Sequence, residues 1–112
     1  MEDWIEHRRG DGERVGWMRA EGDLFVPVDL LGRDLGAAAD WLAAEEMLER
    51  AGIGYLADPY ELRLPDGSWL PVRLAEVSSQ RIIAKQEDFQ AIGAPQVFFT
   101  LPFPMPEELR PR

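Results

Sequence analysis

Short β-favouring runs, separated by turn signals rich in Gly, Asp and Pro, recur along most of this chain and constrain its fold more than any other feature. Three such runs lie between residues 4 and 29, divided by turns at residues 10–12 and 20–23. We expect these runs to pair in sequence order as a three-stranded meander. Pro27 lacks a backbone N–H, so the third strand should lie at a sheet edge or end at that residue.

A second group of runs lies in the later half of the chain. Residues 60–64 and 69–77 alternate apolar and polar side chains on either side of an Asp-Gly turn at residues 65–68, which predicts a half-buried hairpin. Residues 81–85 and 96–101 are further candidate strands, and the last of these is very apolar. The sheet is therefore expected to be mostly antiparallel.

Residues 34–52 carry the one convincing helix pattern in the sequence. At about 100° per residue, apolar side chains fall on one arc and charged side chains on the opposite arc. The apolar arc holds Ala37, Trp41, Ala44, Met47, Leu48 and Ala51, and the charged arc holds Glu45, Glu46, Glu49 and Arg50. Either Asp34 or Asp40 can cap the N-terminus of this helix, and Gly52 suits a left-handed C-cap.

Together these patterns predict an α+β fold: a mostly antiparallel twisted sheet, or a small open barrel, of seven to eight strands with one amphipathic helix. A chain of 112 residues fits one domain, which we assign to residues 1–101. Alternate prolines from Pro102 to Pro106 cannot continue a central strand. Residues 102–112 should therefore form a proline-rich, extended C-terminal tail.

The residue types present narrow the possible chemistry. The chain has no cysteine, which excludes a disulfide framework, a thiolate nucleophile and sulfur-ligated zinc. Its one histidine, His7, leaves little for a site built on imidazole groups. The carboxylates of Glu45, Glu46 and Glu49 suggest a metal site, but on so acidic a helix they are more typical of a solvated face. We therefore expect no metal, no cofactor and no catalytic residue.

The charge balance narrows the possible partners. Lys and Arg number 12 against 21 Asp and Glu, and the resulting net charge of -9 repels phosphate backbones, so we expect no direct binding of nucleic acid. The N-terminal residues are acidic, and the apolar stretches are short. We expect neither a signal peptide nor a membrane span, and hence a soluble cytoplasmic protein.

Large apolar side chains near strand ends and in the C-terminal segment are the candidates for binding another protein. They are Trp4, Trp69, Phe98, Phe99, Phe103 and Met105. Residues 97–101 would be an aggregation hazard as an open edge, and the flanking prolines act as gatekeepers. Either this segment is a central strand with the tail packed over the domain, or it is a docking surface for a second copy or another protein.

The loop at residues 29–36 is a second candidate site. Asp29 and Asp34 suit a hard cation or acid–base work, and Arg33 suits a carboxylate or a phosphate. The same residues also fit a purely structural role, in which one Asp caps the helix and Arg33 pairs with the other.

From these features we expect a small, soluble, acidic protein-interaction or accessory module without catalytic activity. Its partner would be an unknown protein or another copy of itself. The alternative is a small-molecule-binding protein, or a minor carboxylate-based enzyme, with a pocket near residues 29–36.

Overall fold

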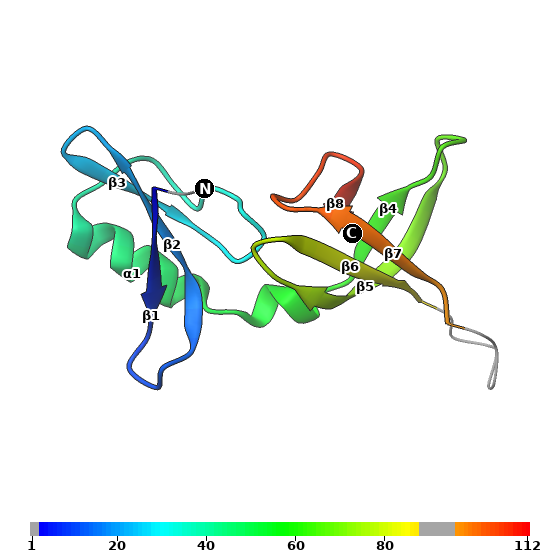
Figure 1. Ribbon diagram of the computed structural model, residues 1–112, viewed down its shortest axis with the longest axis horizontal. Coiled ribbons are helices and arrows are strands. Elements are labelled where there is room, and N and C mark those ends of the chain that lie inside the picture. Colours follow the sequence, from blue (N-terminus) through cyan, green and yellow to red (C-terminus); the bar gives the residue numbers. More distant parts are fainter. Residues whose placement is uncertain (1–2, 88–95) are drawn as a thin grey trace. The chain divides into compact units, whose positions relative to one another are not determined.

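The computed structural model describes residues 3–87 and 96–112. The chain divides into two compact units, Met1–Tyr55 and Leu56–Arg112. The described residues form eight strands, all in antiparallel pairs, and one α-helix (Figure 1). The predicted α+β class is confirmed. The strands belong to a three-stranded sheet and a five-stranded sheet, and neither sheet closes into a barrel.

The first unit is built on the predicted meander. Strands β1 (Trp4–Arg8), β2 (Arg14–Glu21) and β3 (Leu24–Val28) pair antiparallel in the order β1-β2-β3. Pro27 therefore lies on an edge strand, as its missing N–H predicts. The central strand β2 contributes Val15, Trp17 and Met18 to the buried core.

Helix α1 (Trp41–Ala51) is shorter than the sequence pattern predicts. Asp40, not Asp34, is its N-cap, and the Asp40 carboxylate accepts a hydrogen bond of 2.8 Å from the Ala43 N–H. Gly52 ends the helix with a φ of 61° and donates its N–H to the Leu48 carbonyl. The residues before Asp40 instead form β-bridges with strand β3.

The helix packs on β2 and β3 through a narrower face than predicted. Ala44 and Leu48 are buried in one cluster with Val15 and Met18. Trp41, which the periodicity places in the core, is 37% exposed. The reason is its place in the first turn, where its ring contacts Phe25 edge-on at 5.1 Å but only part of it is covered.

Gly16 allows β2 to lie close both to the backbone of β3 and to the helix. A Cβ atom at this position would lie 2.1 Å from the Val28 carbonyl oxygen and 2.8 Å from a Leu48 methyl group. Its φ of 153° is also one that residues with a side chain rarely adopt. A residue without a side chain is therefore required here.

The second unit is a five-stranded antiparallel sheet in the order β7-β6-β5-β4-β8. Its strands are β4 (Tyr60–Arg63), β5 (Trp69–Val77), β6 (Arg81–Gln86), β7 (Phe98–Pro102) and β8 (Leu109–Pro111). The predicted hairpin is the β4–β5 pair. The buried residues are Tyr60, Leu62, Val72, Ile82, Ala84 and Leu109.

Two further segments complete the described chain. Gly54–Ala57 form a 3-10 helix at the junction of the units. In the C-terminal segment, Leu109–Pro111 form β8, which pairs with β4. The division into a domain of residues 1–101 and a tail stays a prediction. Within the described residues, no helix has the length and apolar character needed to cross a membrane.

Candidate functional site

Strand β7 lies at the edge of the five-stranded sheet (Figure 1). Its inner side pairs with β6, with Phe99 opposite Ala84 and Leu101 opposite Ile82. No described strand pairs with its outer side. The prediction that this segment is a central strand is therefore wrong, because in the described chain it has one neighbour and not two.

The pairing with β6 determines which backbone groups of β7 point outward. Gln86 donates its N–H to the Val97 carbonyl at 2.8 Å, so residues 97, 99 and 101 direct their backbone groups toward β6. Because strand residues alternate, Phe98 and Thr100 direct both N–H and C=O away from the sheet. Pro102 adds a carbonyl but has no N–H.

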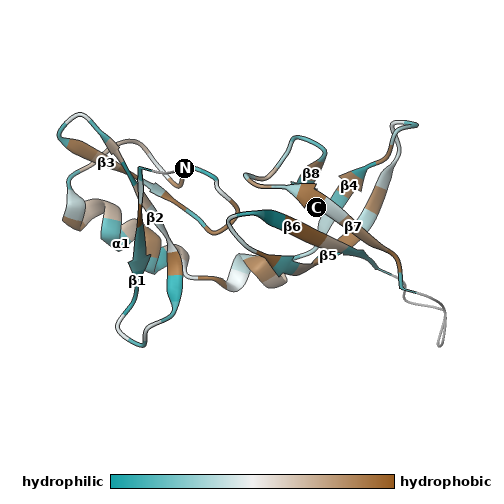
Figure 2. Cartoon of the chain, in the orientation of Figure 1, coloured by the Kyte–Doolittle hydropathy of each residue, from teal (hydrophilic) through white to brown (hydrophobic). Residues whose placement is uncertain are grey.

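The side chains of β7 alternate in the same way. Phe98 is 53% exposed, and Thr100 and Pro102 are also exposed, whereas Phe99 and Leu101 are half-buried. Figure 2 shows β7 largely in the colour of hydrophobic residues. The sequence carries no ionisable side chain from residue 89 to residue 106. The outer edge of β7 is thus hydrophobic and uncharged in a chain with a net charge of -9.

The edge strand β3 differs from β7 because it is covered. Phe25 exchanges two backbone hydrogen bonds with Ala39, at 2.8 and 2.9 Å, and the Pro27 carbonyl accepts from the Leu35 N–H. The segment before the helix thus satisfies the outer backbone groups of β3. Covering an edge in this way prevents it from pairing with another chain.

The other two edges are protected by different means. β1 carries charged Glu6 and Arg8, whose side chains form an ion pair of 2.7 Å. In β8, the Leu109 N–H is bonded to the Pro106 carbonyl at 3.1 Å, and Pro111 has no N–H. Charged side chains and missing donors are common protections for sheet edges. Pro102 likewise removes one donor at the end of β7, but among the described strands β7 alone keeps outward N–H groups, at Phe98 and Thr100, beside which there is neither a charged side chain of the strand nor a covering segment.

The six predicted interaction residues are placed very differently. Phe98 is exposed, whereas Phe99, Phe103 and Met105 are half-buried. Trp4 packs on Trp17 with ring centroids 5.7 Å apart. Phe98 and Phe99 lie on the β7 edge, and Trp4 belongs to the other unit.

Trp69 is half-buried beneath two arginine side chains. The guanidinium carbon of Arg110 lies 3.6 Å from the Trp69 ring centroid, and that of Arg63 lies 5.9 Å from it. Such cation–π contacts account for an aromatic residue at this strand end. The role of Trp69 as an interaction residue stays a prediction, which these contacts do not favour.

The loop at residues 29–36 is held by its own side chains. Asp29 is 1% exposed; one carboxylate oxygen accepts the N–H groups of Leu31 and Arg33, each at 2.9 Å. The other oxygen accepts from the Arg33 Nε at 2.8 Å. Buried carboxylates are stable when paired in this way. These contacts support the structural role of Asp29 and Arg33.

Asp34 points to a different partner. Its carboxylate oxygens accept two hydrogen bonds from Arg19, at 2.7 and 3.1 Å. The bond to Asp34 raises the pKa of Arg19, which stays charged in any case. The structure therefore directs Asp29 and Asp34 to separate arginines, and the hypothesis of a pocket at this loop stays a prediction that these contacts do not favour.

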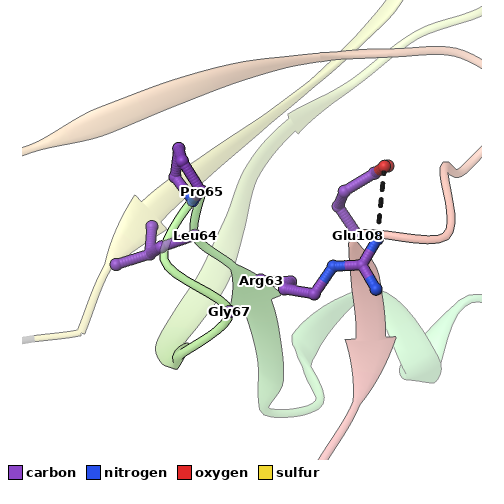
Figure 3. A pocket seen from close by; sticks show the side chains of 5 residues that line it. All are labelled: Arg63, Leu64, Pro65, Gly67 and Glu108. Atoms are coloured by element: carbon purple, nitrogen blue, oxygen red, sulfur yellow. Dashed lines mark ion pairs between the residues drawn. The ribbon is translucent and has the colours of Figure 1, made fainter.

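A surface pocket of about 530 Å³ lies elsewhere, beside the β4–β5 turn. It is lined by Arg63, Leu64, Pro65, Gly67 and Glu108 (Figure 3). Arg63 and Glu108 form an ion pair of 3.7 Å across it. Because its two charged side chains pair with each other, we assign no ligand to this pocket.

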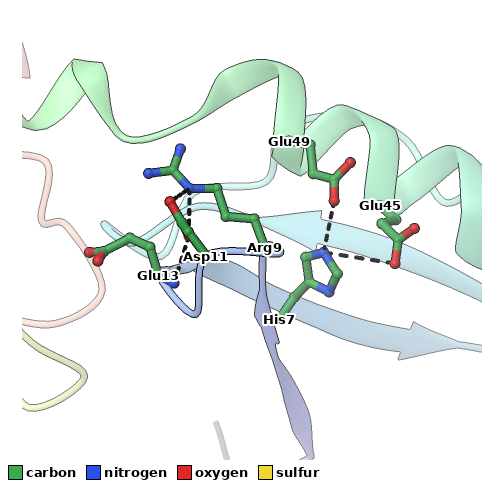
Figure 4. Close-up of polar contacts among 6 residues, drawn as sticks. All are labelled: His7, Arg9, Asp11, Glu13, Glu45 and Glu49. Atoms are coloured by element: carbon green, nitrogen blue, oxygen red, sulfur yellow. Dashed lines mark hydrogen bonds and ion pairs between the residues drawn. The ribbon is translucent and has the colours of Figure 1, made fainter.

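His7 faces the charged arc of helix α1, as Figure 4 shows. It is 9% exposed, and its Nε2 lies 3.8 Å from a carboxylate oxygen of Glu45 and 3.8 Å from one of Glu49. These distances exceed those of hydrogen bonds. The described residues contain no group of three or more His, Asp or Glu side chains that could hold a metal ion.

Comparisons of the chain with protein-family models, with curated proteins and with solved structures found no match. The β7 edge is thus assigned from its own geometry. Sequence reasoning singled out Phe98 and Phe99 but not Thr100, whose backbone lies at the middle of the exposed edge. In the sequence, Thr100 stands between the two phenylalanines and Pro102. Its outward direction can be recognised only once the register of β7 with β6 is known.

Proposed function

We propose that this protein is a non-catalytic protein-interaction module that binds another polypeptide chain along the outer edge of β7. The observation that supports this proposal most is the combination of outward N–H and C=O groups at Phe98 and Thr100 with an uncharged, exposed strand. An extended chain that adds to such an edge gains main-chain hydrogen bonds, and side-chain contacts provide specificity.

The other sheet edges strengthen this proposal. β3 is covered by the segment before the helix, and β8 offers no free N–H from Leu109 or Pro111. Because these edges are protected while β7 keeps outward N–H groups at Phe98 and Thr100, β7 is the described edge best suited to pairing with another chain. Phe98 then supplies the exposed aromatic side chain that often anchors an interface.

The experiment is co-purification from the native host with tagged wild-type protein and two variants. Thr100→Lys places a charged side chain at the middle of the edge, and Leu42→Lys makes a comparable change on the helix, where Leu42 is 63% exposed. We expect a stoichiometric partner, which can be the untagged chain itself, with wild type and Leu42→Lys but not with Thr100→Lys.

Salt tests the nature of the contact in the same experiment. Backbone hydrogen bonds and apolar contacts persist at high salt, whereas surface ion pairs are screened. We therefore expect the partner to remain bound at high salt. A partner retained equally by Thr100→Lys, or no partner with any protein, would contradict the proposed function.

A further inference from the structure

We propose that the chain that binds β7 is a second copy of this protein, with the two β7 strands paired antiparallel about a two-fold axis. This inference rests on the function proposed above and names its partner. Two features of the β7 edge support it: its hydrogen-bonding groups are complementary to themselves, and its segment is uncharged. A third feature lies on the opposite edge of the same sheet, β8, which cannot form a complete ladder with β7.

The backbone groups of the edge are self-complementary. If the two-fold axis passes at Thr100, the Thr100 N–H donates a hydrogen bond to the carbonyl of the partner's Thr100. The Phe98 N–H then donates to the carbonyl of the partner's Pro102. If the axis passes at Phe99, Phe98 and the partner's Thr100 exchange both of their bonds. In either register each copy contributes two N–H donors, and all four donors find an acceptor.

The absence of charge in this segment favours a second copy over a partner selected by charge. Each copy has a net charge of -9, yet residues 89–106 contain no ionisable side chain, so no like charges meet where the two strands pair. The nearest basic residues on the exposed face, Lys85 and Arg81, lie one strand away on β6, and Arg81 is paired with Glu76 at 3.5 Å.

The far edge of the sheet limits the assembly to two copies. On β8, Leu109 and Pro111 direct their backbone groups outward, but the Leu109 N–H is bonded to Pro106 and Pro111 has none. This edge presents carbonyls without donors, so β7 of another copy could form no more than half a ladder with it. Pairing of β7 with β7 leaves no second open edge in the described part of this sheet, and the assembly closes as a dimer.

The test is the mass of the purified full-length protein by sedimentation equilibrium over a range of concentrations. Wild type and Leu42→Lys should approach twice the monomer mass of 12.7 kDa as concentration rises. Thr100→Lys, which sets two like charges near each other across the axis, should raise the dissociation constant at least about tenfold.

A second variant separates charge from hydrogen bonding. Thr100→Pro removes an N–H that points away from β6, so it breaks no bond within the sheet but removes a donor from the dimer. We expect it to weaken the dimer as well. Circular dichroism and thermal unfolding at low concentration show whether each variant keeps the wild-type fold, and Thr100→Lys carries the test if Thr100→Pro does not.

The outcomes distinguish this inference from the proposed function. Wild-type protein that stays monomeric, or a dimer that folded Thr100→Lys does not weaken, overturns the second copy as the partner. If the wild type is monomeric but binds a different stoichiometric protein that Thr100→Lys does not bind, the proposed function stands without this inference. If neither the dimer nor a bound protein responds to Thr100→Lys, both are overturned.

Discussion

The hydrogen bond from the Gln86 N–H to the Val97 carbonyl, 2.8 Å long, determines the direction of every backbone group along β7. It directs residues 97, 99 and 101 toward β6 and leaves Phe98 and Thr100 facing outward. A shift of one residue in this register would reverse both the outward groups and the exposed side chains. The proposed interaction therefore depends on this pairing.

Replacing Asp29 by Ala should destabilise the first unit strongly. The carboxylate of Asp29 is buried and accepts from Leu31 N–H and from two groups of Arg33, so its loss leaves donors without partners. We expect a decrease in the free energy of unfolding of about 3 kcal/mol, measured by urea denaturation. Asp34→Ala is the matched control, because it removes an exposed carboxylate from Arg19 and should cost about 1 kcal/mol or less. Equal effects would contradict the structural role of Asp29.

Replacing Gly16 by Ala tests the close contacts of β2 with the Val28 carbonyl on β3 and with Leu48 on the helix. The added Cβ would overlap the Val28 carbonyl and a Leu48 methyl group, and the φ of 153° adds strain. We expect a loss of at least about 3 kcal/mol by the same measurement. Gly22→Ala is the control, since that glycine has a φ of 61° but open space around it, and it should lose about 1 kcal/mol. A Gly16→Ala protein as stable as Gly22→Ala would show that Gly16 does not lie this close to the Val28 carbonyl and the Leu48 side chain.

The turn at Asp66 should make stability depend on pH in the acid range. The Ser68 hydroxyl donates to the Asp66 carboxylate at 2.6 Å and the Ser68 N–H at 2.9 Å, and these bonds lower the pKa of Asp66 below 3.8. A lowered folded-state pKa stabilises the fold at pH values above 3.8, and this contribution is lost as the pH falls through the folded-state value.

Asp66→Asn gives the measurement for this prediction. Asn keeps an acceptor oxygen but has no charge to lose, so wild type should be the more stable protein at neutral pH. The difference in unfolding midpoint should shrink as the pH falls below 3.8. A difference that stays constant with pH would mean that the charge of Asp66 does not contribute.

Local patterns in the sequence predicted much of the fold. Turn residues and alternation identified the meander and the hairpin, and Pro27 placed β3 at an edge. The helix began later than predicted because Ala39 and its neighbours pair with β3, a contact between distant residues that periodicity does not contain. Trp41 was misplaced because this later start puts it in the first turn of the helix, where only part of its ring is covered.

The candidate site was only partly predictable. The apolar character and flanking prolines of residues 97–101 raised the possibility of a docking strand, together with the wrong alternative of a central strand. Strand order decides between them, and it depends on long-range pairing that local sequence does not specify. The blocked edge at Leu109 and Pro111 likewise emerges only when β8 is placed beside β4.

Amide hydrogen exchange by NMR at several protein concentrations tests the central claim most directly. The amides of Phe99 and Leu101, which are bonded to β6, should be protected at every concentration. The amides of Phe98 and Thr100 should exchange rapidly in dilute protein and in folded Thr100→Lys, and become protected in wild type as the dimer forms. If Phe98 and Thr100 stay unprotected while wild type dimerises, or are protected equally in the monomer, β7 is not the strand that pairs.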